Sequence, residues 1–473
     1  MKAKNITILI TGIILLAATI TTSAQENTTL YFMKGMPQST MFNPALHNDS
    51  SAVVIGLPGL SGVYVGMNSD FAVNDLIHYG TGNMSDSLVI DIDGFHNALK
   101  DGQNTFRQNF DVSIFYLGFR TKNTFISFSV NEKESAQTGF AKSFITFLKE
   151  GNGPYMGKTQ DLGDLMFNAY HYREYALGAS QELMDGKLSV GFRFKALYGK
   201  FSLQTEKLNF KVETAGDGSS VKLQTDMQLN FSAPVTPEYD EDNYFNGFED
   251  NFEASEYILG SDNMGMAFDL GAVFKVTPQI TVSASIVDIG KIPFKTNVYN
   301  VTKNQSYTWE GLDFSNSLDD SDPNYISADD MMDEEIEKLE AVVRPKKSEI
   351  TSNAFDMKLP TKIFMGGTYA LNSKVNFGLL DRLYIYNGET SNSITVSANA
   401  MLGNFFSVTG SYSAMNGTYN NLGLGLAARL GFLQFYMASD NLLALSDPAK
   451  AQAFNVRFGL NILFGRKYQS FVH

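Results

Sequence analysis

The stretch NVRFGLNILFG, residues 455–465, alternates between large apolar side chains and small or polar ones. The large apolar set occupies every second position and consists of Val456, Phe458, Leu460, Ile462 and Phe464. The positions between carry Arg457, Gly459 and Asn461, with Leu463 as the exception. Because successive side chains of a β-strand point to opposite faces, this period of two predicts a strand. Its length, roughly ten residues, is the length that crosses a membrane in a β-barrel.

The same alternation recurs at residues 188–199, 266–276, 280–286, 394–402 and 421–432. One face of each stretch is apolar, and the other carries mainly small or polar residues with a few charges. In a membrane barrel the apolar face meets lipid and the other face lines the lumen. The charges that this places in the lumen are Arg193, Lys195, Asp269, Lys275, Arg429 and Arg457. A soluble β-sandwich is the alternative, with its apolar face turned inward and these charges in water.

The connections between strands favour the membrane barrel. Short turns such as Lys122-Asn123 and Asp185-Gly186 alternate with long connections. This asymmetry is typical of outer-membrane barrels, whose periplasmic turns are short and whose external loops are long. We expect the barrel to span residues 49–473, with loop insertions near 60–110, 132–172, 205–262 and 290–360.

The strand count supports a closed barrel. The spanning strands from residue 111 onward, together with one near Ala52–Leu60, add up to about fourteen strands. This count assumes that the hairpin at 200–231 extends above the membrane and adds no spanning strand. We therefore predict an all-β fold, a transmembrane antiparallel β-barrel of about fourteen strands with long extracellular loops.

The first 24 residues have the pattern of a secretory signal peptide. Lys2 and Lys4 precede an apolar run from Ile6 to Ala18, and small residues lead to a cleavage site after Ala24. The run is too short to serve as a transmembrane helix, which needs about 20 residues. A secreted chain of this composition is expected in the outer membrane of a Gram-negative bacterium.

The composition agrees with that location and excludes other functions. The chain has no cysteine, 13% aromatic residues and only 18% charged residues. Its net charge is −14, or −16 when the two signal-peptide lysines are subtracted. An acidic balance argues against a nucleic-acid partner, because phosphate backbones are bound by Lys and Arg.

Motifs that carry catalysis or hold a metal are missing from the sequence. The five histidines (His47, His78, His96, His171 and His473) have no metal-ligand spacing, and there is no P-loop or G-x-S-x-G motif. The acidic runs Asp240–Asp242 and Asp319–Asp322 lack the Gly turn and terminal Glu of a Ca²⁺ loop. We predict no enzyme activity, no metal site and no cofactor.

The segment FNPAL, residues 42–46, precedes the first strand. Pro44 restricts Asn43 to extended geometry, and an Asn side chain can close a local turn, so the segment suits a compact element without strands. Met33, Met36 and Met41 add flexible apolar surface that can fill a lumen. The alternative is an ordinary periplasmic lead-in to the first strand.

FNPAL resembles the Asn-Pro-Ala signature of FadL-type fatty-acid transporters, and it is similar to PorV- and PorP-type barrels linked to type IX secretion. VDIGKI (287–292) resembles another element of such barrels, and EYALGASQELMDGKLSVGFRFKALYG (174–199) resembles an uncharacterised Bacteroidota family of outer-membrane barrels. The resemblance implies that residues 25–48 form a hatch or plug inside the barrel. The motif residues of this plug-like segment are then Phe42, Asn43, Pro44, Ala45 and Leu46.

Two functions remain open. One is FadL-like passage of a hydrophobic or amphipathic small molecule, with an apolar lumen pocket lined by inward Phe115, Leu117 and Phe125. The other is a barrel that docks an envelope protein as an accessory subunit, with a lumen full of paired charges and an exposed aromatic patch on its loops. The acidic loop 238–253 and a helix over 327–343, capped by Ser327, belong to loops large enough for such docking. Membrane lipid surrounds the barrel in both cases.

Overall fold

The computed structural model of the chain describes residues 28–46, 51–260, 262–317, 325–403, 405–415, 418–465 and 470–472. The predicted signal peptide, His47, His473 and the run Asp319–Asp322 lie outside these ranges.

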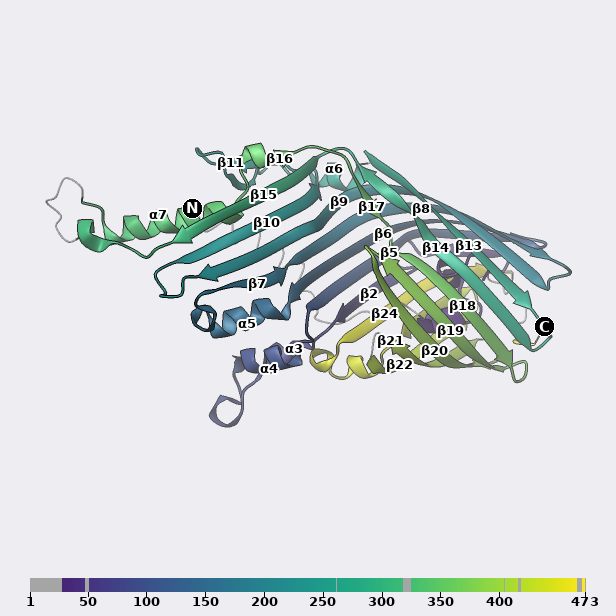
Figure 1. Cartoon of the computed structure of the whole chain (residues 1–473). Helices are drawn as coiled ribbons and strands as arrows, with labels where there is room; N and C mark the ends of the chain where they lie inside the picture. The colour runs from purple at the N-terminus through teal and green to yellow at the C-terminus, as the bar shows by residue number, and fades with distance from the viewer. Residues whose placement is uncertain are drawn as a thin grey trace.

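One antiparallel sheet closes on itself to form a barrel (Figure 1). Its first spanning strand has two parts, β1 (Val53–Gly56) and β2 (Val63–Ser69), and both pair with β5 on one side and β24 on the other. The spanning strands that follow are β5 (Gln103–Thr121), β6 (Thr124–Ala141), β8 (Met166–Leu183), β9 (Leu188–Thr214), β13 (Asn263–Lys275), β14 (Ile280–Phe294), β18 (Thr361–Ala370), β19 (Val375–Tyr386), β20 (Glu389–Leu402), β21 (Phe406–Met415), β22 (Thr418–Leu430), β23 (Leu433–Ser439) and β24 (Ala453–Phe464). The closed barrel of 14 strands confirms the predicted fold class.

The barrel buries its polar face and exposes its apolar face. On β13, Met266 and Leu270 are exposed, whereas Ala267 and Asp269 between them are fully buried. The same order holds on β24, where Phe458 and Phe464 are exposed and Arg457 and Asn461 are buried. A soluble sandwich shows the opposite order, so the soluble alternative is wrong.

Several strands continue beyond the barrel on the side of the long loops (Figure 1). The outer part of β9 pairs with β10 (Val221–Ser232), which pairs with β15 (Val298–Trp309). This extension also includes β7 (Lys158–Asp164), β16 (Ile350–Thr351), the hairpin β11 (Pro237–Tyr239) to β12 (Phe245–Phe248), and β17 (Phe355–Lys358), which pairs with β14. The hairpin at 200–231 therefore extends the sheet, as the strand count assumed.

The helices are mostly short. They are α2 (Thr28–Phe32), α3 (Val73–Leu76), α4 (Ile92–Ala98), α5 (Lys142–Glu150), α6 (Ala254–Leu259) and α7 (Ala328–Val343); a small hairpin pairs β3 (Ile77–Tyr79) with β4 (Leu88–Ile90). Ser327 Oγ accepts the backbone N–H of Asp330 at 3.0 Å, so the predicted capped helix at 327–343 is confirmed. Within the described ranges, no helix has the length and apolar character to cross a membrane.

The predicted lining of the lumen by Phe115, Leu117 and Phe125 is wrong in part. Phe125 points inward and is buried, but a bulge between Ser113 and Phe115 shifts the register of β5 against β6. One inserted residue moves the following side chains to the opposite face. Phe115 and Leu117 therefore face outward beside the lipid-facing Phe128, with the Phe115 and Phe128 rings 6.1 Å apart.

Candidate functional site

Residues 28–46, which we call the plug, lie inside the barrel. The plug contains α2 and a single 3₁₀ turn, Pro37–Met41, and nearly all of its side chains are buried. Its apolar members form the main core cluster together with the inward wall residues Val287, Phe364, Leu380 and Tyr436. A closed barrel leaves a lumen that must be filled or wet, and here a segment from the N-terminal side fills it.

The start of the plug is held by Asp440, which follows β23. Its carboxylate accepts the backbone N–H of Thr28 at 3.1 Å and that of Thr29 at 2.8 Å. Asn455 orients the carboxylate by donating Nδ2 to Asp440 Oδ2 at 2.8 Å. The Thr29 and Ser411 hydroxyls form a further hydrogen bond of 2.7 Å between plug and wall. These contacts satisfy the first donors of α2, which have no partner within the helix.

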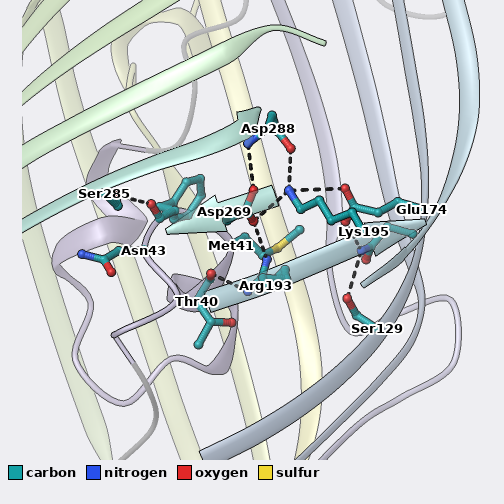
Figure 2. Close-up of polar contacts among 12 residues, drawn as sticks. Thr40, Met41, Asn43, Ser129, Glu174, Arg193, Lys195, Asp269, Ser285 and Asp288 are labelled. Atoms are coloured by element: carbon teal, nitrogen blue, oxygen red, sulfur yellow. Dashed lines mark hydrogen bonds and ion pairs between the residues drawn. The ribbon is translucent and has the colours of Figure 1, made fainter. Parts of the chain in front are cut away.

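The FNPAL motif makes the contacts at the other end of the plug (Figure 2). Asn43 Oδ1 accepts the Ala45 N–H at 2.9 Å, which closes the local turn, and its Nδ2 donates to the carbonyls of Ala272 and Ala284 at 3.4 and 3.3 Å. Ser285 Oγ donates to the Phe42 carbonyl at 2.6 Å. Ala45 is buried and Leu46 packs on the core cluster. Asn43 thus joins the plug to two neighbouring strands, β13 and β14.

Several wall residues that face the plug are glycines, because the wall backbone and the plug lie too close together to leave room for a side chain. A Cβ added at Gly271 would overlap Asn43 Oδ1 and lie 2.9 Å from Pro44 Cδ. A Cβ at Gly191 would overlap the Pro44 backbone, and one at Gly378 would overlap the Phe32 ring. The small inward residues noted in the sequence therefore make room for the plug.

A cluster of buried charges lies next to the plug (Figure 2). Lys195 Nζ is at its centre, 2.9 Å from Asp269 Oδ2 and 3.5 Å from Glu174 Oε2, and it also donates to Asp288. Lys133 Nζ lies 3.1 Å from Glu174 Oε2. Buried ions persist only when they are paired, and here each carboxylate faces at least one cation.

Arg193 links this cluster to the plug. Its guanidinium lies 3.6 Å from Asp269 Oδ2 and donates to the Thr40 carbonyl (Figure 2). On β14, Asp288 adopts a positive φ of 62° and donates its N–H to Asp269 Oδ1 at 2.8 Å. This left-handed residue sits where β14 carries one extra residue against β13, inside the VDIGKI stretch.

Two other predicted lumen charges, Arg457 and Arg429, have partners outside the cluster. Arg457 donates to Asp111 Oδ2 at 2.9 Å and stacks 4.6 Å from the Tyr64 ring centre. Lys275 faces the lumen near the short turns, and Arg429 Nη1 lies 3.4 Å from Ser51 Oγ at that same end. The structure therefore brings together three of the six predicted charges, Arg193, Lys195 and Asp269.

Two cavities flank the plug. The outer one, about 60 Å³, is lined by Met41 and Phe42 of the plug and by wall residues that include Tyr172, Lys362 and Arg457. The inner one, about 160 Å³, is lined by a larger part of the plug and by wall and tail residues; its lining includes Tyr31, Phe32, Met33, Leu46, Lys275 and Phe471. Both are smaller than the roughly 300 Å³ of a typical ligand pocket. The plug therefore stands between two small cavities.

Within the described part of the chain, no group of three or more His, Cys, Asp or Glu is placed to hold a metal ion.

Comparison with protein families gives one match, which covers residues 44–440 and so most of the chain. The chain belongs to the family of unknown function DUF5723. The matched range of this DUF5723 chain includes the whole charge cluster and ends at the plug anchor Asp440, but it leaves out the plug before Pro44.

Several solved structures are similar to this DUF5723 protein at low sequence identity. The Ralstonia pickettii toluene transporter TbuX is 10% identical, with a TM-score of 0.40 over 91% of this chain and 94% of its own. A Pseudomonas aeruginosa FadL homologue is 10% identical, with a TM-score of 0.40 over 94% and 98%. The P. putida toluene transporter TodX is 8% identical, with a TM-score of 0.38 over 94% and 96%. The comparison with curated proteins finds no significant match.

Sequence reasoning missed Lys133, Glu174 and Asp288, half of the charge cluster. Glu174 precedes an alternating stretch in which Ala176, Gly178 and Ser180 share its face, so its inward direction was readable. Lys133 lies in the run NEKES (131–135), where the residues on both faces of the strand are polar, so the sequence does not indicate which face points into the lumen.

Proposed function

We propose that this protein passes a small hydrophobic or amphipathic molecule across the outer membrane of a Gram-negative bacterium, with residues 25–48 as a movable hatch. The observation that carries the proposal is the position of the plug between the outer and inner cavities. Plug side chains form walls of both, Met41 and Phe42 outside and Tyr31, Phe32 and Met33 inside. Displacement of this one segment would join the two spaces.

The way the plug is held supports movement as a unit. Its polar links to the wall are those at Asp440 and at the FNPAL motif, the reciprocal pair of Gln38 and Asn461, and single hydrogen bonds such as Gln434 to the Gly35 carbonyl at 3.2 Å. Its apolar side chains pack on wall residues such as Phe364 and Leu380, and several wall positions beside it are glycines. Methionine and phenylalanine surfaces of this kind repack readily and accept apolar ligands.

A second candidate function is an accessory subunit that docks an envelope protein. The charge cluster favours it, because paired charges in the lumen are what a barrel without a transport path would contain. In both cases we propose a protein without enzyme activity.

The test locks the plug. The chain has no cysteine, so the Thr29→Cys/Ser411→Cys pair, whose native hydroxyls are 2.7 Å apart, would tie plug to wall through one disulfide. The matched control is Thr395→Cys/Ser413→Cys, whose hydroxyls are 2.8 Å apart and which ties two wall strands together. Uptake of labelled laurate by cells expressing each variant would be measured, with a polar sugar as reference.

Oxidation of the plug lock should abolish laurate uptake, and reduction should restore it, while the wall lock should transport in both states. Equal uptake by the oxidised plug lock and the wall lock would rule out the hatch. No uptake by any form, reduced forms included, would favour the accessory subunit.

A further inference from the structure

Helix α7 lies on the extension with one face against the sheet (Figure 1). Val342 is buried on that face, and Tyr307 of β15 donates its hydroxyl to Glu335. One apolar face is all that a helix needs to pack on a sheet. The rest of α7 is thus expected to be polar.

A second row of apolar side chains lies beside that face instead. Met332, Ile336 and Leu339 follow at intervals of four and three residues, so they form one stripe along the helix. Each is 46% exposed. We call these three residues the outer stripe. A continuous apolar stripe that is left in water is characteristic of an interaction surface.

Acidic side chains line one side of the outer stripe. Asp333, Glu337 and Glu340 lie along the side of the stripe that faces away from the sheet, and Lys338 is the one basic residue within Ala328–Val343. Lys338 is already paired with Glu334 at 2.9 Å and Glu335 at 2.7 Å. The stripe therefore has an anionic border.

The neighbouring hairpin β11–β12 extends this acidic surface. Arg344, at the end of α7, binds Asp240, and the Phe245 N–H donates to the Pro345 carbonyl at 2.9 Å. Burial raises the pKa of Asp240, but the Tyr244 backbone N–H and the Arg344 guanidinium outweigh it and hold the pKa below its ordinary value. Asp240 thus stays ionised at neutral pH, and Glu238, Glu241 and Asp242 add charge on the same hairpin.

Charge decides between possible occupants of the stripe. A second copy of this chain would bring a second acidic helix, and like charges across an interface oppose association. An anionic membrane surface attracts basic segments and would repel this one. A helix with an apolar seam bordered by Lys or Arg matches both the stripe and its acidic border, as in coiled-coil pairing.

We propose that the outer stripe is a docking site for a partner protein that presents a cationic amphipathic helix. Three apolar side chains make a small contact, so the complex is transient and depends on salt. This docking does not require the hatch to move, so the docking proposal can be tested independently of the transport proposal.

The test uses the full chain in detergent and a labelled 16-residue helical peptide with a leucine seam and lysine flanks. Two further peptides serve as probes: a scramble with the same composition and no seam, and one with the same seam and glutamate flanks. Affinity would be measured by fluorescence anisotropy at two salt concentrations. The variant is Met332→Ser/Ile336→Ser/Leu339→Ser, and Leu148→Ser on α5 is the control for an exposed leucine.

The lysine-flanked peptide should bind at least tenfold more tightly than either of the other two, and more weakly at high salt. The triple variant should lose that advantage, while Leu148→Ser should keep it. Equal binding of the scramble, equal binding of the glutamate-flanked peptide, or an unchanged triple variant would overturn the proposal. Self-association of the chain that disappears in the triple variant would overturn it as well, in favour of a second copy.

Discussion

Gly271 shows how single residues adapt the wall to the plug. Its missing side chain lets Asn43 approach the backbone of β13 and bridge to β14. In the sequence, such glycines indicate only a crowded lumen. The structure identifies what crowds it, because the glycines face the plug backbone and its aromatic rings.

Gly271→Ala should loosen the plug. The new methyl would overlap the Asn43 amide, and overpacking of this kind costs about 1–3 kcal/mol. Gly410→Ala is the matched control, because a Cβ there meets nothing within 4 Å. Conductance in planar bilayers should rise for Gly271→Ala and remain at the wild-type level for Gly410→Ala. Equal conductance of the two variants would mean that the contact does not hold the plug.

Lys195→Met should destabilise the barrel strongly. It removes the cation shared by Glu174, Asp269 and Asp288, and breaking a buried ion pair costs about 3–5 kcal/mol. Lys187→Met, at an exposed turn, should cost less than about 0.5 kcal/mol. The temperature at which the folded band disappears in heat-modifiability gels measures both. Trp309 fluorescence is unsuitable, because that residue lies in the extension.

Lys195→Met/Asp269→Asn should recover part of the loss, since one of the carboxylates that Lys195 neutralises is removed together with the lysine. If the double variant melts no higher than Lys195→Met, the two side chains do not act as a pair.

Elements differ in how far the sequence determines them. The alternation at 188–199 and 455–465 predicts strands and their facing, because lipid on one side and lumen on the other impose a period of two. Bulges break this rule without a clear sequence signal. One near Ser113 turned Phe115 and Leu117 outward, and one in β14 placed Asp288 beside Asp269. The charge cluster was therefore only half predictable, since it depends on register between strands.

The C-terminal tail is the element that closes the inner side of the plug. Lys34 donates to the Ser470 carbonyl and lies 5.6 Å from the Phe471 ring centre. Phe471 is buried against Ala370 and Met401, and its N–H donates to the Ser373 carbonyl at 3.1 Å. The tail thus ties the plug to turns of the barrel wall.

Phe471→Ala should free the inner end of the plug. With Met36→Cys as a reporter that is buried in the plug, maleimide labelling in the folded protein should become several-fold faster. Ser470→Ala is the control, because it keeps the backbone carbonyl that Lys34 binds. Labelling that is equally slow in both variants would show that the tail does not restrain the plug.

For the whole molecule, the surrounding medium decides which exposed apolar residues are tolerated. Leu379, on the outer face of β19, is 55% exposed, and Leu148, on α5 outside the barrel, is 65% exposed. In water the two positions would be equivalent. In a membrane, Leu379 meets lipid near the middle of a spanning strand, where an arginine costs about 2–4 kcal/mol.

Leu379→Arg should therefore reduce the amount of folded protein in the outer membrane, while Leu148→Arg should leave it close to wild type. The measurement is the heat-modifiable fraction in isolated outer membranes, with total expression as the reference. Equal assembly of the two variants would mean that the outer face of β19 does not meet lipid. The part of the barrel that lies in the membrane would then be different, and the assignment of the outer and inner cavities would change with it.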